Sequence, residues 1–396
     1  MKKVLFLIPL AALAMVSCSS DSAEQAAQVS NQEVKLFPQV TGATRGTVET
    51  TSSISNFQLI ATGKFATTAT ATAATVTNTG IKYAIKSGST WSLFGEAAGT
   101  TDYKLYWFDA TTTGKFTAYA NSGTVAASDG KLTGVTVAAD VDDQADLVVA
   151  YNEGTKADFA AGVPLHFRHA MSQIVVKASY TYDASLTGYE TKTIKVKGIK
   201  FFNLKNSGTL TLPTASTAAG ETYEPAWSGH TGSTAYEVTL NTPVTLGSTA
   251  TAIDLSEAAN PLLLLPQTTA AETQLVKDAP STTTFTGAYL AVQVNIDNAD
   301  SSDYYPVANA GANAYAWVAV PVSIEWKGGN KYIYTLNFTN GAMGRIAPGT
   351  VDAGDGQVTP DGKKVGDALP DELLTPVTFL VTVEDEWTEN NLTPTF

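Results

Sequence analysis

The side chains best suited to chemistry are few and scattered along the chain. Two of the three histidines, His166 and His169, lie three residues apart in a stretch that reads as a β-strand. Side chains alternate between the two faces of a strand, so these imidazoles point to opposite faces and need a bulge to share a metal ion. His230 lies in a Gly- and Ser-containing stretch that we interpret as a loop, with no activating group beside it. We therefore predict no metal centre built on histidine.

Aspartates gather in three stretches with the composition of loops. Ca²⁺ takes six to eight oxygen ligands, which loops of this kind could supply in part. None of the stretches has the spacing of an EF-hand. We interpret them as solvated turns and keep calcium binding as the alternative. The three groups are Asp140, Asp142, Asp143 and Asp146; Asp297, Asp300 and Asp303; and Asp352, Asp355 and Asp361.

Motifs for nucleophilic, metal-dependent or nucleotide chemistry are not found. The sequence has no G-x-S-x-G elbow, no H-E-x-x-H and no phosphate-binding loop. A carbohydrate-stacking surface could use tryptophans, but most of these stand among strand residues and are expected in the core. They are Trp91, Trp107, Trp227, Trp317, Trp326 and Trp387. We predict a protein that is not an enzyme and uses no cofactor, with a hydrolase as a remote alternative.

The N-terminus has the layout of a secretory signal peptide. Lys2 and Lys3 precede an apolar run over Val4–Val16, which is too short to span a membrane. Cys18 follows, and its setting resembles the lipobox of bacterial lipoproteins, in which the cysteine becomes the lipidated N-terminus. Because this is the only cysteine in the chain, disulfides and thiol catalysis are excluded together. The prediction is an exported lipoprotein whose acyl chains, such as palmitate, anchor it to the outer membrane.

Composition limits the partners. The chain has 396 residues, which allows two domains, and 44% apolar residues, which is enough for real cores. A net charge of −13 with scattered basic residues argues against nucleic acid, because nucleic-acid surfaces need clustered Lys and Arg.

Short alternating runs separated by Gly, Asn, Asp and Pro predict an all-β fold. In "NFQLIATGKF" the residues Phe57, Leu59 and Ala61 share one face, and "LLLL" within "NPLLLLPQ" predicts a strand covered on both faces. The runs form two groups. We predict a signal over 1–18, a linker with a removable edge strand over 19–45, and two β-sandwiches with Greek-key or meander connections over 46–160 and 161–396.

Several stretches together resemble the fimbrillin family, the type V pilins and related Mfa-like surface lipoproteins. They are "ATRG", "VPLHFRHAMSQIVVKA", "NPLLLLPQ", "VPVSIEWKGGNKYIYTLNF" and "FLVTVEDEW". The resemblance implies two transthyretin-like β-sandwiches and a lipoprotein precursor that a trypsin-like protease cuts after a basic residue. Arg45, followed by Gly46, fits that cleavage position.

The resemblance also implies assembly by donor-strand exchange. Val34, Leu36 and Val40 fall on one face of an extended segment, in which Pro38 is tolerable at a sheet edge. Loss of this segment after cleavage would open a slot for a strand of the next subunit. The donor lies within residues 377–396, either in the strand-like run or in the tail. Its candidate residues are Val377, Phe379, Val381, Val383, Leu392 and Phe396.

The predicted protein is therefore a structural subunit of a fimbria, or pilus, at the cell surface that supports cell adhesion. Its expected partners are other copies of itself, other fimbrial subunits, the processing protease, the outer membrane, and host or bacterial surface ligands. The alternative is a monomeric surface lipoprotein that binds host or polysaccharide ligands. Asp21, Ser22 and Ala23 resemble an O-glycosylation acceptor, and Asp21 with Glu24 resembles a surface-export signal. Stalk, anchor and tip roles stay open.

Overall fold

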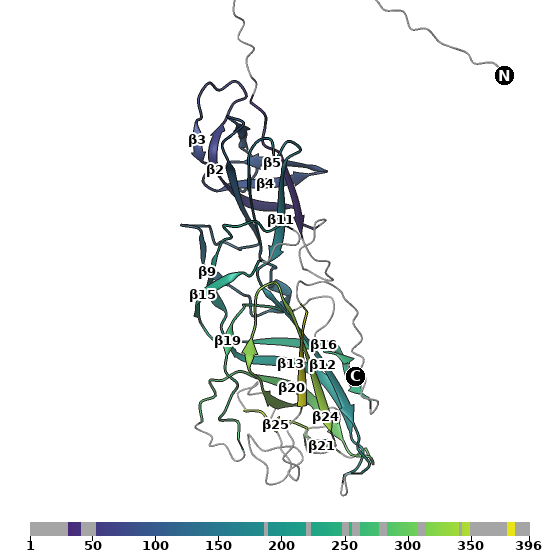
Figure 1. Ribbon diagram of the computed structural model, residues 1–396. Coiled ribbons are helices and arrows are strands. Elements are labelled where there is room, and N and C mark those ends of the chain that lie inside the picture. The colour runs from purple at the N-terminus through teal and green to yellow at the C-terminus, as the bar shows by residue number, and fades with distance from the viewer. Residues whose placement is uncertain are drawn as a thin grey trace, which may run out of the picture.

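The computed structural model describes most of the chain between residues 31 and 384 (Figure 1). The described ranges are 31–40, 53–185, 189–218, 223–247, 253–255, 262–276, 283–301, 303–306, 314–339, 343–348 and 378–384. Within them the protein is all-β, as expected: 26 strands and one 3-10 turn, η1 (Val141–Asp143), without an α-helix. The same ranges contain no helix long and apolar enough to cross a membrane.

One end of the molecule is built from a ten-stranded sheet, counted over the described residues, in the order β1-β11-β10-β8-β2-β4-β5-β6, with β3 and β7 paired to β2. Figure 1 shows it in the upper part. Its strands are β1 (Leu36–Val40), β2 (Asn56–Ala66), β3 (Val76–Asn78), β4 (Lys82–Ser87), β5 (Thr90–Phe94), β6 (Asp102–Tyr103), β7 (Tyr106–Trp107), β8 (Gly114–Ala120), β10 (Val148–Gly154) and β11 (Val163–His169).

The other end contains two larger sheets. The first has the order β17-β12-β24-β26, with β18 on β12, and consists of β12 (Ser172–Thr181), β17 (Ile253–Asp254), β18 (Leu262–Leu264), β24 (Lys331–Thr339) and β26 (Thr378–Glu384). The second has the order β16-β13-β20-β22-β25, with β21 on β20, and consists of β13 (Thr193–Leu204), β16 (Thr234–Leu246), β20 (Tyr289–Asp297), β21 (Asp303–Tyr305), β22 (Ala316–Pro321) and β25 (Arg345–Ile346).

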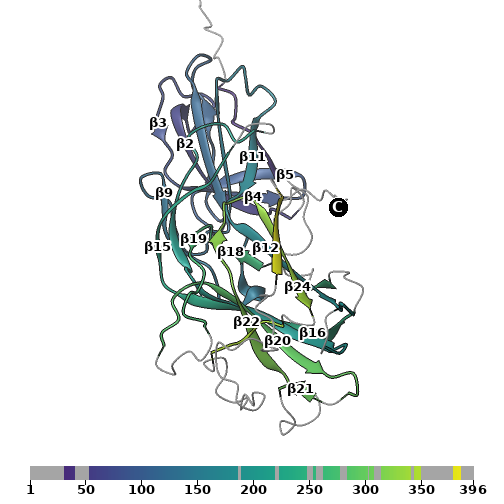
Figure 2. The same ribbon diagram turned by 60° about the horizontal axis from the view of Figure 1, so that its bottom comes forward.

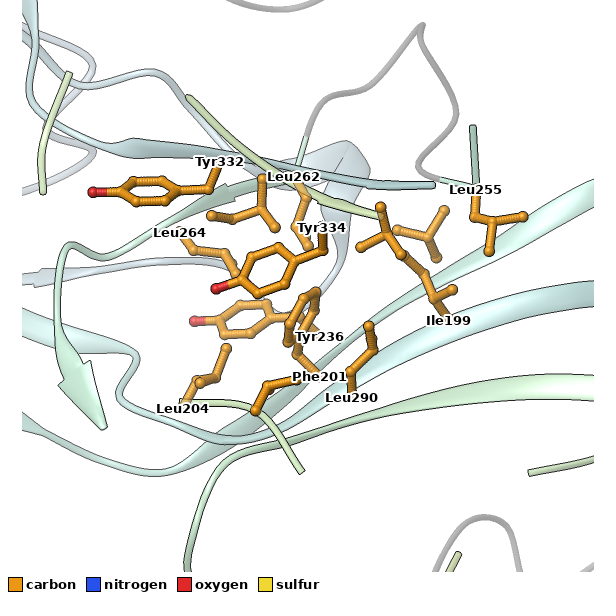
Figure 3. Packing of buried hydrophobic residues seen from close by; sticks show 14 of the residues in the cluster. Ile199, Phe201, Leu204, Tyr236, Leu255, Leu262, Leu264, Leu290, Tyr332 and Tyr334 are labelled. Carbon is orange, nitrogen blue, oxygen red and sulfur yellow. The ribbon is translucent and has the colours of Figure 1, made fainter. Parts of the chain in front are cut away.

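Apolar side chains from these two sheets interlock in one core. Leu262 and Tyr334 come from the first sheet, and Phe201, Tyr236 and Leu290 from the second (Figure 3). Alternation supplies part of this core: on β24 the inward positions, such as Tyr334 and Phe338, are buried and the positions between them are only partly buried. β20 and β22 differ, because nearly all of their positions are buried. The run Leu262–Leu265 is likewise buried at every position, which confirms the strand covered on both faces.

Two small sheets complete the described strands. One has the order β15-β14-β9 and consists of β9 (Lys131–Thr136), β14 (Ser207–Thr211) and β15 (Ala226–Thr231); the other pairs β19 (Thr268–Thr269) with β23 (Ile324–Glu325). The first joins distant parts of the chain, because β9 leaves the ten-stranded sheet region and pairs with β14. Figures 1 and 2 both show β9 and β15 beside the junction of the two ends.

The two ends have separate cores. One cluster includes Phe57, Phe65 and Phe116 from the ten-stranded sheet, and it also includes Val163 and Phe167 of β11. The large cluster spans β12 to β25, and it also takes in side chains of the β9 region, namely Leu132, Val135 and Val137. The domain limits 46–160 and 161–396 stay a prediction. Residues after 160, such as Val163, belong to the core of the ten-stranded sheet, and residues before 160, such as Leu132, belong to the large core.

Candidate functional site

The N-terminal segment that the sequence singles out forms the edge strand β1. It pairs in parallel with β11, from Leu36 opposite Val163 to Val40 opposite Phe167. The Val163 amide donates to the Lys35 carbonyl at 2.8 Å. In Figure 1, β1 is the purple arrow next to β11. β1 has no second strand neighbour among the described residues, so it is an edge strand of the ten-stranded sheet.

Residues just before β1 reach a different edge of the same sheet. The Val34 amide donates to the Leu105 carbonyl at 2.8 Å, and the Trp107 amide donates to the Gln32 carbonyl at 2.9 Å. The Asn31 amide donates to the Ala69 carbonyl at 2.8 Å. The segment 31–40 therefore bridges two edges, one near β7 and one at β11.

Burial alternates along the segment as a sheet face requires. Val34, Leu36, Pro38 and Val40 are buried, whereas Glu33, Lys35, Phe37 and Gln39 are exposed. The three aliphatic side chains belong to the core cluster of the ten-stranded sheet. The predicted inward face is thus the buried face.

The register explains why a proline is tolerated in β1. The Val163 amide bonds to Lys35, so in a parallel ladder the donors that β1 turns toward β11 are the amides of Phe37 and Gln39. The missing amide of Pro38 would point to the open side. Pro38 therefore costs no ladder bond and discourages another strand from pairing with that edge.

Phe37 is one of two large apolar side chains exposed in the described residues, at 49%. Its ring covers Gly162, where an added Cβ would run into the ring. Gly162 also has φ +130°, a conformation that side chains other than glycine rarely adopt. Gly162, just before β11, therefore leaves room for the exposed Phe37 ring to pack against the backbone.

One ion pair fastens the start of the segment. Lys104 Nζ lies 2.9 Å from Glu33 Oε1. This hydrogen bond raises the pKa of Lys104 above its ordinary value, with burial acting in the opposite direction. Both side chains are about half exposed, at 49% and 44%, so the pair adds little stability.

The second predicted strand, within residues 377–396, is β26. It lies at the edge of its sheet and pairs antiparallel with β24, from Lys331 opposite Glu384 to Asn337 opposite Thr378. Phe379, Val381 and Val383 are on this strand. The remaining predicted residues of the site lie outside the described residues: Cys18, Arg45, Gly46, Val377, Leu392 and Phe396.

The histidines occupy three different environments. His169 Nδ1 lies 2.8 Å from Asp146 Oδ2, and both side chains are almost fully buried. Burial, and next the charge of Arg168, lower the pKa of His166 below its ordinary value of 6.5. His230 is in strand β15 rather than in the loop we expected, and its Nε2 lies 2.7 Å from the Pro266 carbonyl oxygen.

The aspartates are used locally where they are described. Asp140 accepts a bond from the Asp142 amide at the start of η1, and Asp297 pairs with Lys195 at 3.0 Å. Asp146 differs from the expected solvated turn residue, because it is buried against His169. No group of three His, Cys, Asp or Glu side chains suited to a metal ion is found among the described residues. Asp352, Asp355 and Asp361 lie outside the described ranges.

The tryptophans serve the core, as the strand pattern predicts. Trp107, Trp317 and Trp326 are buried, and Trp91 and Trp227 pack partly buried against the clusters. Trp387 lies outside the described residues. The sequence pattern missed one buried contact set, in which Thr217 from the loop after β14 bonds to β10 and β11.

The sequence model of a family described as Fimbrillin-like matches residues 41–356, which is well over half of the chain. The chain belongs to the fimbrillin-like family. The matched range starts directly after β1 and ends before β26, so the arguments about those strands rest on their geometry. No protein with a curated description matches the sequence of this fimbrillin-like chain.

Several solved structures are similar to this fimbrillin-like chain. A fimbrial protein from Bacteroides vulgatus is 16% identical, with a TM-score of 0.44, and the match covers 78% of this chain and 95% of that one. A protein provisionally described as a cell adhesion protein, from Bacteroides ovatus, is 15% identical, with a TM-score of 0.42 and coverage of 91% and 99%. A protein with the same description from Parabacteroides distasonis is 10% identical, with a TM-score of 0.43 and coverage of 90% and 96%.

Proposed function

We propose that this chain is a structural subunit of a surface fimbria that polymerises by strand exchange and supports adhesion. It is exported and anchored to the outer membrane by lipid attached to Cys18. It folds as two transthyretin-like β-sandwiches and has no catalytic role. Other copies of the chain and other fimbrial subunits are its partners. The observation that carries the proposal is an edge strand with a buried apolar face, followed a few residues later by Arg45.

Cleavage after Arg45 converts a closed subunit into an acceptor. While attached, residues 31–40 satisfy two sheet edges and cover the core with Val34, Leu36 and Val40. Burial of three such side chains is worth roughly 5 to 9 kcal/mol gross, at about 1.5 to 3 kcal/mol each. A partner strand with the same pattern recovers this energy. Because donor and acceptor lie at different places on each subunit, the contact is head-to-tail and builds a filament.

The arginine content supports selective cleavage. The chain has only three arginines, Arg45, Arg168 and Arg345. Arg168 is buried in β11, and Arg345 belongs to strand β25. A protease needs an extended, accessible segment, which a sheet does not offer. An arginine-directed, trypsin-like protease would therefore cut at Arg45, within the polar stretch "TGATRGTVETTSS".

The donor is the tail segment Leu392–Phe396, and β26 stays in its sheet. The tail sequence "LTPTF" repeats the pattern of β1, "LFPQV", with an apolar residue, a proline and an apolar residue at alternate positions. Leu392, Pro394 and Phe396 would occupy the seats of Leu36, Pro38 and Val40. β26 has a ladder of seven residue pairs to β24 that its departure would break.

Cleavage and assembly are tested with the purified full chain and limited trypsin treatment, followed by electrophoresis in SDS without heating. The wild type and Arg45→Lys, which keeps a trypsin site, should form SDS-resistant multimers. Arg45→Ala should stay monomeric. Multimers of equal yield from Arg45→Ala would refute processing at this residue, and a monomeric, cut wild type would favour the ligand-binding surface lipoprotein instead.

The donor is tested by mixing. The double variant Leu392→Asp, Phe396→Asp should fail to form multimers by itself after cutting, yet accept the strand of a cut wild-type subunit. Val381→Asp, in β26, is the comparison. If Val381→Asp blocks donation while the tail variant assembles normally, then β26 is the donor.

A further inference from the structure

Strand β11 has an incomplete neighbour on the side away from β1. Its antiparallel pairing with β10 is limited to Val148 opposite His169 and Val149 opposite Arg168. Continuing that register would place Tyr151 opposite His166. The ladder stops before this pair, so the part of β11 that pairs with β1, Val163–Phe167, has no strand partner on its β10 side among the described residues.

A residue from the loop after β14 fills this gap. Thr217 is fully buried, at 0% exposure. Its hydroxyl accepts from the Tyr151 amide at 3.0 Å and lies 2.7 Å from the His166 carbonyl oxygen, to which it donates. The Thr217 amide donates to the Tyr151 carbonyl at 3.1 Å. Thr217 thus takes the place of the missing rung between Tyr151 and His166.

Further contacts, from the same loop and from β10, hold this side of β11. Arg168 donates from Nε to the Thr217 carbonyl at 3.0 Å and from Nη2 to the Ala218 carbonyl at 2.7 Å. Asn152, in β10, donates from Nδ2 to the Pro164 carbonyl at 2.8 Å. Pro164 itself has no amide hydrogen to donate toward β10. Side chains and one inserted loop therefore replace the usual strand on this side.

We propose that Thr217 is a positioning residue for the acceptor site: it holds β11 in place when β1 is absent. The inference rests on the proposed function, because an acceptor role for β11 follows from release of β1. While β1 is bound, β11 has a partner on one side. After release, the segment Val163–Phe167 keeps its place through Thr217, Arg168 and Asn152. The far half of the subunit thereby prepares the strand that receives the donor.

The alternative is that Thr217 only adds general stability. The two ideas differ in which amides lose hydrogen-exchange protection when the Thr217 hydroxyl is removed. If Thr217 positions β11, its hydroxyl protects the amides that face β1, those of Val163, Leu165 and Phe167. If it adds general stability, amides throughout the chain, including β20, lose protection together.

The test compares Thr217→Val, which keeps the shape without the hydroxyl, with Thr217→Ser, which keeps the hydroxyl. Hydrogen exchange is measured on the full chain, intact and cut after Arg45. The valine variant should raise exchange at Val163, Leu165 and Phe167 by about tenfold, since two buried groups lose their partner, while β20 stays within about twofold. The serine variant should match the wild type within about threefold.

Uptake of a labelled peptide with the sequence of residues 31–45 by the cut chain gives a second readout. Thr217→Val should bind it about tenfold more weakly than the wild type and Thr217→Ser. Equal exchange at β11 in all three proteins, or a uniform rise that includes β20, would overturn the positioning role. A cut wild type that binds no peptide would instead count against strand release, and the exchange pattern of the intact chain would still decide the role of Thr217.

Discussion

The strength with which β1 holds its place depends on its inward side chains, and Leu36 gives the sharpest test. Leu36 is 7% exposed and belongs to the core of the ten-stranded sheet. Truncation of a buried leucine to alanine costs about 2 to 5 kcal/mol, from lost transfer energy and the cavity left behind. Because β1 is an edge strand, we expect this loss in the local opening of β1 rather than only in global unfolding.

The matched control lies one position away. Lys35 is exposed on the outer face of the same segment. Lys35→Ala keeps the backbone and changes no buried contact, so its effect should stay within about 0.5 kcal/mol. The pair of variants separates the apolar face from the rest of the strand.

Native-state hydrogen exchange measures the opening directly. The Val163 amide, which donates to Lys35, reports on contact with β1. In Leu36→Ala its exchange should rise by roughly 30-fold or more, since each 1.4 kcal/mol is a factor of ten. Amides of β20 should change much less. Unchanged exchange at Val163, or an equal rise in β20, would refute the view that the inward face of β1 holds a separately removable strand.

Three further predictions concern the core and the charges. Gly114→Ala should destabilise the chain by about 1 to 3 kcal/mol in urea unfolding, because an added Cβ would lie 2.9 Å from the Phe65 and Trp107 rings. Gly95→Ala is the control and should have little effect, because the nearest atom would be 3.9 Å from its Cβ. Equal unfolding midpoints for the two variants would contradict this. The depressed pKa of His166 means that the unfolded chain binds the proton more readily, so stability should fall as the pH drops below 6.5. His166→Gln should reduce that fall in unfolding curves between about pH 7 and 5. An unaltered dependence of stability on pH would show that other groups cause the fall. Hydrogen bonds from the Thr112 amide and hydroxyl hold the pKa of Asp109 down to about 2, from 3.8. The stabilising effect of Asp109 should be present above pH 3.8 and lost as the pH falls toward 2. Asp109→Asn should therefore make the melting temperature depend less on pH over that range, and a melting temperature that falls as in the wild type would count against this effect.

The amino-acid sequence by itself determined the features that depend on near neighbours. Alternation with a period of two indicated the all-β class and the inward face of the N-terminal segment, formed by Val34, Leu36 and Val40. The unbroken leucine run that starts at Leu262 indicated a strand buried on both faces. The place of Pro38 also followed from local chemistry, since a residue without an amide suits an edge. These properties are set within a few residues, so they can be read without knowing the partner strand.

Only the tertiary structure decided which strands meet. The parallel pairing of β1 with β11, the pairing of β9 with β14, and the burial of Asp146 against His169 join residues that are far apart in sequence. Thr217 looked like one more polar residue in a Thr- and Ala-rich stretch, yet it is fully buried between β10 and β11. Alternation states which face of a strand is apolar and leaves its neighbour unspecified, because the neighbour is chosen by how all the faces pack together.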